Sequence, residues 1–305
     1  MNIRLWGVRG SIPCPGPQTA IYGGNTACME VSWGPDDSQV LVVDAGSGIR
    51  PLGNQWMKTR FPKGPIKTRI LFSHTHWDHI MGFPFFTPIF IPSTEIDIYG
   101  PVTFEEDSLD KVIGGQLQYR YFPVTMAELS AQITYHRLQE TQLEFELGLK
   151  VTTKYLNHPI TCLGYRFEHE GKVIVTLFDH EPFRNLFITD PKHPDFDQEV
   201  FDEGERAATE ENQKILEFMR DADVVLHDAK YTEKEYRKNR TGWGHSSIEW
   251  AINAAHKAGV KTLVLMHHDP ERLDSELEAF QENYRRLIQQ KSSMKLVFAQ
   301  EGMVF

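Results

Sequence analysis

The sequence has few cysteines, no long apolar run and no excess of basic residues. Its three cysteines (Cys14, Cys28 and Cys162) are too few and too scattered for a disulfide framework or a cysteine-based zinc site. No segment approaches the roughly 18 consecutive apolar residues of a membrane span. The N-terminal stretch MNIRLWGVRGSIP lacks the apolar core of a secretory signal. We therefore expect a cytoplasmic protein with no membrane partner.

The charge balance is acidic, with 32 basic and 42 acidic residues and a net charge of −10. A protein that grips a nucleic-acid backbone usually presents a basic face, because neutralising phosphates supplies most of its affinity. The balance therefore argues against a large polyanionic substrate. A small phosphate compound stays open, because bound metal ions can supply positive charge locally.

Short β-branched runs alternate with helical patterns along the 305 residues, and no linker or repeat divides them. Residues 25–33 and 39–46 predict neighbouring strands, and 162–180 predict a hairpin that turns at Glu170 and Gly171. Further strands are predicted at 68–74, 95–100, 149–158, 222–228, 261–268 and 294–300. Helices are predicted at 105–113, 205–220, 246–258 and 271–290. This pattern indicates a single α/β domain of sandwich-like construction.

Three segments carry more specific expectations. The helix at 246–258 has Ser246 as its predicted N-cap, Glu249 as the capping-box partner and Gly259 at its end. Residues 181–204 are rich in Pro, Asp and Phe and predict a long loop, as a lid or an interface. The apolar stretch 83–92 suits either a wall of a groove or a dimer contact.

Several predicted strands stop at a residue that can ligate a metal. The strand 68–74 runs into the cluster HTHWDH, which places His74, His76, Asp78 and His79 within six positions. Other strands end in the same way, at Asp44, His158, Asp179, His227, Asp228 and His267. Strand tips can converge at one edge of a sheet, which is where α/β folds build sites. A single strand-end histidine is usually a packed one, but this series predicts a metal centre.

The ligand types and spacing indicate hydrolytic chemistry. In an extended turn His74 and His76 face the same way and can share one ion, whereas Asp78 and His79 point to a second position. Asp179 is the candidate for a carboxylate that bridges the two. Two ions about 3.5–4 Å apart hold a hydroxide at neutral pH and stabilise both ends of an in-line displacement. Imidazole and carboxylate suit zinc, iron or manganese.

HTHWDH resembles the HxHxDH signature of the metallo-β-lactamase fold superfamily. The resemblance extends over almost the whole chain, through GVRGSIPCPG, YGGNTACMEV, VVDAGSGIR, NHPITCLGYRFE, LFDHEP and MHHDPER. It implies an αββα sandwich with two ions in a shallow groove at one edge. The expected cofactors are two divalent ions per chain, with zinc as the first choice and manganese or iron as alternatives.

The resemblance assigns the ligands residue by residue. The first ion would take His74, His76 and His158; the second ion would take Asp78, His79 and His267; and Asp179 would bridge. Two points depart from the family pattern. His180 follows the bridging aspartate, where a small polar residue is usual. The last motif has adjacent histidines, and His267 is preferred over His268 because it directly follows the strand.

The C-terminal third resembles the ribonuclease Z and cyclic-phosphodiesterase branch, in which a His-Ser-Ser/Thr motif opens a helix. His245 would be the catalytic histidine that does not ligate metal, with Asp228 as its acidic partner and Asp78 as a further catalytic candidate. A histidine at a helix N-terminus can hydrogen-bond a phosphoryl oxygen or protonate a leaving alkoxide. The alternative is that GHSS is only a capped helix start.

The substrate prediction is a small phosphodiester, such as a cyclic nucleotide or a cyclic sugar phosphate. The basic, Gly-Pro-rich arm that binds tRNA in ribonuclease Z is not evident, since insertions 101–125 and 181–204 are not basic. Nucleic acid is therefore disfavoured. Trp243, Ser246 and Arg9 are substrate-binding candidates, and Trp77 could flank a base or sugar. The alternatives are a structured-RNA endonuclease, a carboxylic ester or lactone hydrolase, and a non-catalytic sensor. The resembled branch also favours a homodimer.

Overall fold

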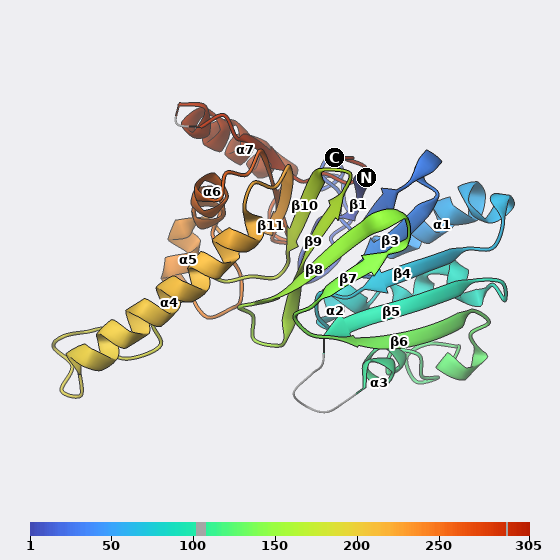
Figure 1. Cartoon of the computed structure of the whole chain (residues 1–305), viewed down its shortest axis with the longest axis horizontal. Coiled ribbons are helices and arrows are strands. Elements are labelled where there is room, and N and C mark those ends of the chain that lie inside the picture. The colour runs from blue at the N-terminus through green and yellow to red at the C-terminus, as the bar shows by residue number, and fades with distance from the viewer. Residues whose placement is uncertain (102–107, 291) are drawn as a thin grey trace.

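Two β-sheets packed face to face form the centre of the computed structural model, which describes residues 1–101, 108–290 and 292–305 (Figure 1). The first sheet has the order β1 (Asn2–Gly7), β2 (Cys28–Trp33), β3 (Gln39–Val43), β4 (Lys67–Leu71), β5 (Glu95–Pro101) and β6 (Gln132–Leu138). The second sheet has the order β13 (Lys295–Phe298), β12 (Thr262–Met266), β11 (Val224–Asp228), β10 (Lys172–Leu177), β9 (Cys162–His169), β8 (Leu149–Leu156) and β7 (Gln142–Phe145). Each strand predicted from the sequence overlaps one of these strands, and the predicted hairpin at 162–180 covers both β9 and β10.

Helices cover both outer faces of this pair of sheets. They are α1 (Ile49–Thr59), α2 (Trp77–Ile80), α3 (Leu109–Gly114), α4 (Gln198–Met219), α5 (Glu233–Asn239), α6 (Ile248–Lys257) and α7 (Asp274–Gln289). Apolar residues of α1 and α3 pack on the first sheet, and those of α6, α7 and the end of α4 pack on the second. The predicted αββα sandwich in one domain is confirmed.

The inner core lies between the sheets because each strand turns alternate apolar side chains inward. Ile3 and Leu5 do so on β1, and Tyr165 and Phe167 do so on β9, all four with no exposed surface. Burying each such side chain stabilises the fold by roughly 1.5–3 kcal/mol. The stretch 83–92 belongs to the outer core, because several of its apolar side chains are buried beside α1.

The helix predicted at 246–258 forms, but its cap lies one residue later than expected. α6 begins at Ile248, and the N-cap is Ser247, whose hydroxyl accepts a hydrogen bond from the Trp250 amide. The expected capping box is wrong, because the Glu249 carboxylate instead accepts from the Glu233 amide and the Tyr284 hydroxyl.

The segment 181–204 is only partly a loop. α4 starts at Gln198, where the Asp197 carboxylate caps it by accepting from the amides of Glu199 and Val200. The helix therefore begins seven residues before the predicted start at 205, and with the preceding segment it projects from the body (Figure 1). We call residues 185–205 the arm. Neither α1 nor α5 was predicted, and the expected helix at 105–113 is α3 in its described part, since 102–107 lie outside the described residues.

Strand direction brings the site together. β3 and β4 run parallel in the first sheet, and β10, β11 and β12 run parallel in the second. The carboxyl ends of parallel strands share one edge of their sheet, where α/β folds place ligands. Within the described residues, no helix is long and apolar enough to cross a membrane.

Candidate metal centre

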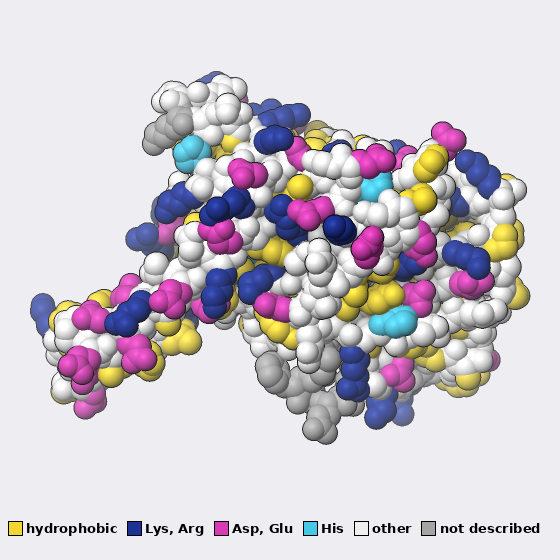
Figure 2. Space-filling model, viewed as in Figure 1, with side chains coloured by type: hydrophobic (Ala, Val, Ile, Leu, Met, Phe, Trp, Pro, Cys, Tyr) yellow, Lys and Arg dark blue, Asp and Glu magenta, His cyan; other side chains and the backbone are white. Residues whose placement is uncertain are grey.

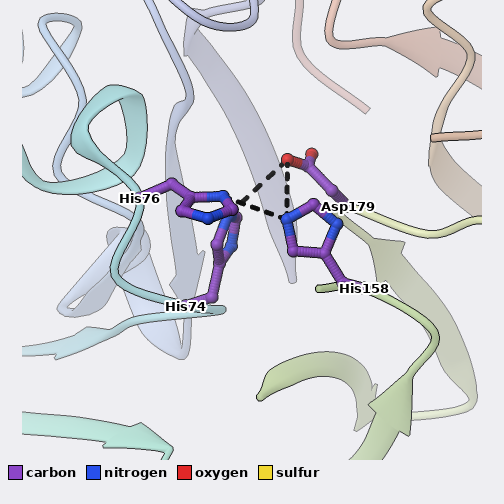
Figure 3. A group of neighbouring side chains, drawn as sticks. All are labelled: His74, His76, His158 and Asp179. Carbon is purple, nitrogen blue, oxygen red and sulfur yellow. Dashed lines mark hydrogen bonds and ion pairs between the residues drawn. The ribbon is translucent and has the colours of Figure 1, made fainter. Parts of the chain in front are cut away.

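Four side chains from three strand ends form the first ligand group (Figure 3). His74 and His76 follow β4, His158 follows β8 and Asp179 follows β10. The Nδ1 atom of His76 lies 3.1 Å from Nε2 of His74 and 3.0 Å from Nε2 of His158. Asp179 Oδ2 completes the group, 3.6 Å from His74 Nε2 and 3.9 Å from His158 Nε2. All four side chains point at one another.

A second ligand group lies on the other side of Asp179. Asp78 and His79 belong to α2, and His267 follows β12. Asp78 Oδ2 lies 3.1 Å from Nε2 of His267 and 3.6 Å from Nε2 of His79. Asp179 Oδ2 faces His79 at 3.5 Å, while its Oδ1 faces His267 at 3.2 Å. Asp179 therefore lies between the two groups, as a bridging carboxylate would.

The adjacent histidines of the last motif have different surroundings. His267, at φ 59°, points into the centre, whereas the ring of His268 points away and its Nε2 hydrogen-bonds the carbonyl of Ala299 at 2.9 Å. Gly10 makes room for His267, because a Cβ at that position would lie 2.2 Å from Cε1 of the ring. The sequence signal for this contact, a glycine in GVRGS, is too common to predict it.

Other side chains orient the candidate ligands. The Asp44 carboxylate accepts hydrogen bonds from the Ser73 amide and hydroxyl, each at 2.7 Å, and lies 2.7 Å from Nδ1 of His79. Nδ1 of His158 lies 2.9 Å from the Gly244 carbonyl oxygen. Such partners fix the ring and tautomer of a ligating histidine. Its position at the end of a strand made Asp44 a ligand candidate. In the structure its carboxylate contacts Nδ1 of His79, on the side of the ring that faces away from the two ligand groups.

The electrostatics suit bound cations. Burial lowers the pKa of His74, and it lowers the pKa of His158 to about 4, so both rings are neutral and carry free lone pairs at neutral pH. Burial opposes the ionisation of Asp78, but the rings of His79 and His267 together outweigh it and hold the pKa of this carboxyl well below its usual range. Burial also opposes a charge on His79, yet the surrounding carboxylates of Asp78, Asp44 and Asp179 raise its pKa. The negative charge of these carboxylates would equally favour a metal ion bound to Nε2 of His79.

Buried polar atoms without a partner test whether this centre fits a metal. Among the described residues, Nε2 of His79 and Oδ1 of Asp179 are buried and make no hydrogen bond. A buried, unsatisfied polar atom costs about 1–3 kcal/mol. Both atoms lie where the two ligand groups face each other, so divalent cations there would satisfy them. The imidazole and carboxylate donors fit zinc and similar ions.

His245 lies beside both ligand groups without being a member of the first. Its Nδ1 atom is 2.9 Å from Oδ2 of Asp228, and its ring stacks on His267 with centroids 4.9 Å apart. Burial works against a charge on His245, but the carboxylates of Asp228 and Asp179 outweigh it and raise the pKa of the imidazole. Nε2 of His245 makes no hydrogen bond to any described residue, so it is free to meet a ligand.

A carboxylate that the sequence did not single out holds the loop before His245. The Glu181 side chain accepts hydrogen bonds from the Gly242 and Gly244 amides, both at 2.7 Å, and from the Tyr236 hydroxyl at 2.6 Å. This fixes the residues around Trp243, whose ring is 55% exposed and is covered on one face by the Arg240 guanidinium at 4.5 Å. Trp243 is therefore available at the surface beside His245.

Two substrate-binding candidates do not reach the centre. Arg9 has no exposed surface, because its guanidinium donates to the carbonyls of Gly23, Asp269 and Arg272 and pairs with Asp274 at 3.5 Å. Ser246 is also fully buried, and its hydroxyl donates to the His180 carbonyl. Both residues hold loops together.

The remaining candidates are packing or surface residues. His180, which departs from the family pattern, has its ring centroid 5.4 Å from that of Trp250 and points away from the ligand groups. The ring of His227 packs against the same tryptophan, with its centroid 5.6 Å from that of Trp250. Trp77 is 68% exposed next to the ligands.

The comparisons with known proteins agree with this geometry. Residues 40–268 match the family described as beta-lactamase superfamily domain. The chain is similar to a ribonuclease Z of Lactococcus lactis subsp. cremoris, with 28% identity over 271 residues that cover 80% of this chain and 83% of that protein. It is also similar, as a fold, to the metallo-beta-lactamase fold protein YhfI from Bacillus subtilis, with 17% identity and a TM-score of 0.64 over 100% of this chain and 98% of that one.

A solved diphosphatase of the PhnP family shows the same architecture, with 16% identity and a TM-score of 0.60 over 100% of this chain and 96% of that one. Proteins with different named activities thus share the fold, so the fold alone does not decide the substrate. Because the family match spans most of the described strands and both ligand groups, the chain belongs to the beta-lactamase superfamily, as a metal-dependent hydrolase of the branch that includes ribonuclease Z.

Proposed function

We propose that this protein is a dinuclear metal-dependent phosphodiesterase that acts on small phosphodiesters. The observation that carries the proposal is the His245–Asp228 pair, which lies beside two ligand groups joined by one carboxylate. The first ion would be held by His74, His76 and His158, the second ion by Asp78, His79 and His267, and Asp179 would bridge them. Zinc is the first choice for both.

The ions, when bound, would activate a water molecule at neutral pH and offset the charge that develops on the phosphoryl group. The chain's own residues supply the rest. Asp228 holds Nδ1 of His245 and, together with Asp179, raises the pKa of the imidazole, which favours its protonated form. Nε2 of His245 is then the donor that meets a phosphoryl oxygen or gives its proton to the departing alkoxide.

The negative charge of the arm favours a small substrate over a nucleic acid. The arm, residues 185–205, carries seven Asp or Glu residues and one Lys. An acidic projection repels a polyphosphate backbone instead of binding it, because backbone affinity comes from neutralising phosphates. The exposed ring of Trp243 beside His245 suits a base or sugar of a small diester.

The test is the metal content of protein purified without chelator, paired with turnover of bis(p-nitrophenyl) phosphate. We expect about two ions per chain and turnover that a chelator removes and added zinc restores. Two ions without phosphodiester turnover would reject the phosphodiesterase and favour carboxylic esters and lactones, which are tested with p-nitrophenyl acetate and a lactone panel. A chain that takes up no metal after reconstitution would reject the centre itself.

A second candidate is an endoribonuclease on structured RNA, because the ribonuclease Z relatives match at 28% identity over 80% of this chain. This function requires cleavage of a precursor tRNA and binding that weakens steeply as salt rises. We expect neither for this chain. Cleavage of precursor tRNA at rates above those on cyclic nucleotides would reverse the order of the two candidates.

A further inference from the structure

A lysine that the proposed reaction does not yet use lies next to the metal centre. Lys230 comes two residues after Asp228, its side chain is 7% exposed, and its Nζ lies 2.6 Å from the Ser11 hydroxyl. This is the one hydrogen bond that its ammonium group makes to the described residues, and no described carboxylate forms an ion pair with it. Two N–H groups of the ammonium therefore have no acceptor atom among the described residues, and its other neighbour is the Tyr231 ring, whose centroid lies 5.8 Å from Nζ.

Such an arrangement is expensive unless an anion completes it. Moving a charged group out of water costs several kcal/mol, which proteins usually offset with an opposite charge or a full set of hydrogen bonds. A hydroxyl is a weak partner for a buried ammonium. Because the Ser11 hydroxyl accepts from Lys230, its own hydrogen stays free to donate. Lys230 and Ser11 together thus offer more free donors than free acceptors.

The position of these donors is fixed relative to the centre. The Ser11 amide donates to Oδ2 of Asp78 at 2.6 Å, so Ser11 borders the second ligand group. The Lys230 amide donates to Oδ1 of Asp228 at 3.2 Å, and Oδ2 of the same carboxylate faces Nδ1 of His245. Ser11 itself is exposed, so a solute can reach this point from solvent.

The other nearby basic residues cannot take this role. Arg9, on the same loop as Ser11, is occupied by carbonyl groups and Asp274. Arg240 stacks on Trp243, and Arg272 pairs with Glu235. Arg184 lines an exposed pocket beside His158, on the side of the first ligand group. Among the described residues near the second ligand group, Lys230 is thus the buried cation whose donors remain available.

We propose that Lys230 Nζ and Ser11 Oγ form a binding site for an anionic phosphate oxygen of the substrate at the edge of the second ligand group. This inference rests on the proposed phosphodiesterase function and deepens it by naming the residues that hold the charge not taken by the ions. An ammonium and a hydroxyl bind a phosphate oxygen through charge-assisted hydrogen bonds, which are about twice as strong as neutral ones.

The experiment uses Lys230→Met, which keeps the length and removes the charge, and Lys234→Met as the matched control, since Lys234 is exposed four residues further on. Inorganic phosphate is the probe, titrated calorimetrically into zinc-loaded protein and used as an inhibitor of bis(p-nitrophenyl) phosphate hydrolysis. We expect Lys230→Met to weaken phosphate binding and raise KM by about 10-fold or more, with zinc content and kcat changed little. Ser11→Ala should weaken phosphate binding by about 3-fold, and Lys234→Met should behave as the unmodified chain.

Two outcomes would overturn the proposal. One is unchanged phosphate affinity and KM in Lys230→Met. The other is loss of zinc in Lys230→Met together with unchanged phosphate affinity in Ser11→Ala, which would mean that Lys230 only braces the loop on Asp78. If the unmodified chain does not hydrolyse the diester, the calorimetric difference still decides the anion site, so the two proposals fail separately.

Discussion

The metal centre and the arm both concentrate charged side chains, but they use them in opposite ways. At the centre, His74, Asp179 and His267 follow three different strands and have at most 2% of their surface exposed. On the arm, Asp195, Asp202 and Glu203 all come from one short segment of the sequence and face solvent, and Figure 2 shows acidic side chains over this projection. Because burying a charge is costly, a buried charged cluster from distant segments indicates function, whereas an exposed acidic run needs only water around it.

The contrast between a functional metal centre and a merely solvated arm is tested most directly by removing a central ligand. Asp179→Ala and His76→Ala should abolish both metal retention and turnover, since Asp179 lies between the two groups and His76 contacts two other ligands. Elemental analysis and diester turnover measure this. The matched control is His193→Ala on the exposed arm, which should keep two ions and full activity. An active, metal-free His76→Ala protein would contradict the assignment.

Removing the proton donor should separate chemistry from metal binding. His245→Ala is expected to retain about two ions and to lose about 10²- to 10⁴-fold in kcat, because general acid catalysis contributes that much. Loss of one ion in this variant would instead make His245 a ligand, in line with its place beside Asp179 and His267. Metal analysis together with kcat distinguishes the two roles.

A change outside the ligands tests how tightly the centre is packed. In Gly10→Ala the new Cβ would overlap the His267 ring, which lies 2.2 Å away, so affinity for one ion should fall by about 10- to 100-fold. Competition with a chromogenic chelator measures this affinity. Gly16→Ala is the control in the same loop, because the nearest atom to its Cβ would be 3.9 Å away. Equal affinities in the two variants would show that the ring has room to move.

The smallest effect is expected on the arm. The double substitution Asp202→Lys with Glu203→Lys should change diester kcat/KM by less than about 2-fold and stability by no more than about 0.5 kcal/mol, because both residues are exposed. Steady-state kinetics and thermal unfolding measure these quantities. A large loss of activity would mean that the arm takes part in catalysis, and it would weaken the contrast drawn above.

Sequence reasoning succeeded where the signal was local. HTHWDH places four side chains within six residues, and the strand ends at His158, Asp179 and His267 follow from short β-branched runs, so their convergence could be expected. The αββα arrangement followed from the order of the strands and the resemblance of the motifs.

The parts that failed depend on residues far away in the sequence. The surroundings of Arg9 are set by carbonyls about 260 positions further along the chain, and no local pattern shows that they surround its guanidinium. Lys230 meets Ser11 across 219 positions. The role of Asp44 depends on the parallel pairing of β3 with β4. Helix starts were off by two to seven residues, because a cap such as Asp197 is visible only once its amide partners are placed.

The ligands come from both sheets, since His74 and His76 follow a strand of the first and His158, Asp179 and His267 follow strands of the second. An unfolded chain cannot present these ligands together, so the ions would bind only the native state. There they would link the first sheet to the second. When the free concentration of an ion is 100 times its dissociation constant, its binding adds about 2.7 kcal/mol to the free energy of unfolding. The lifetime of this fold in a cell would therefore depend on how much free metal the cell allows.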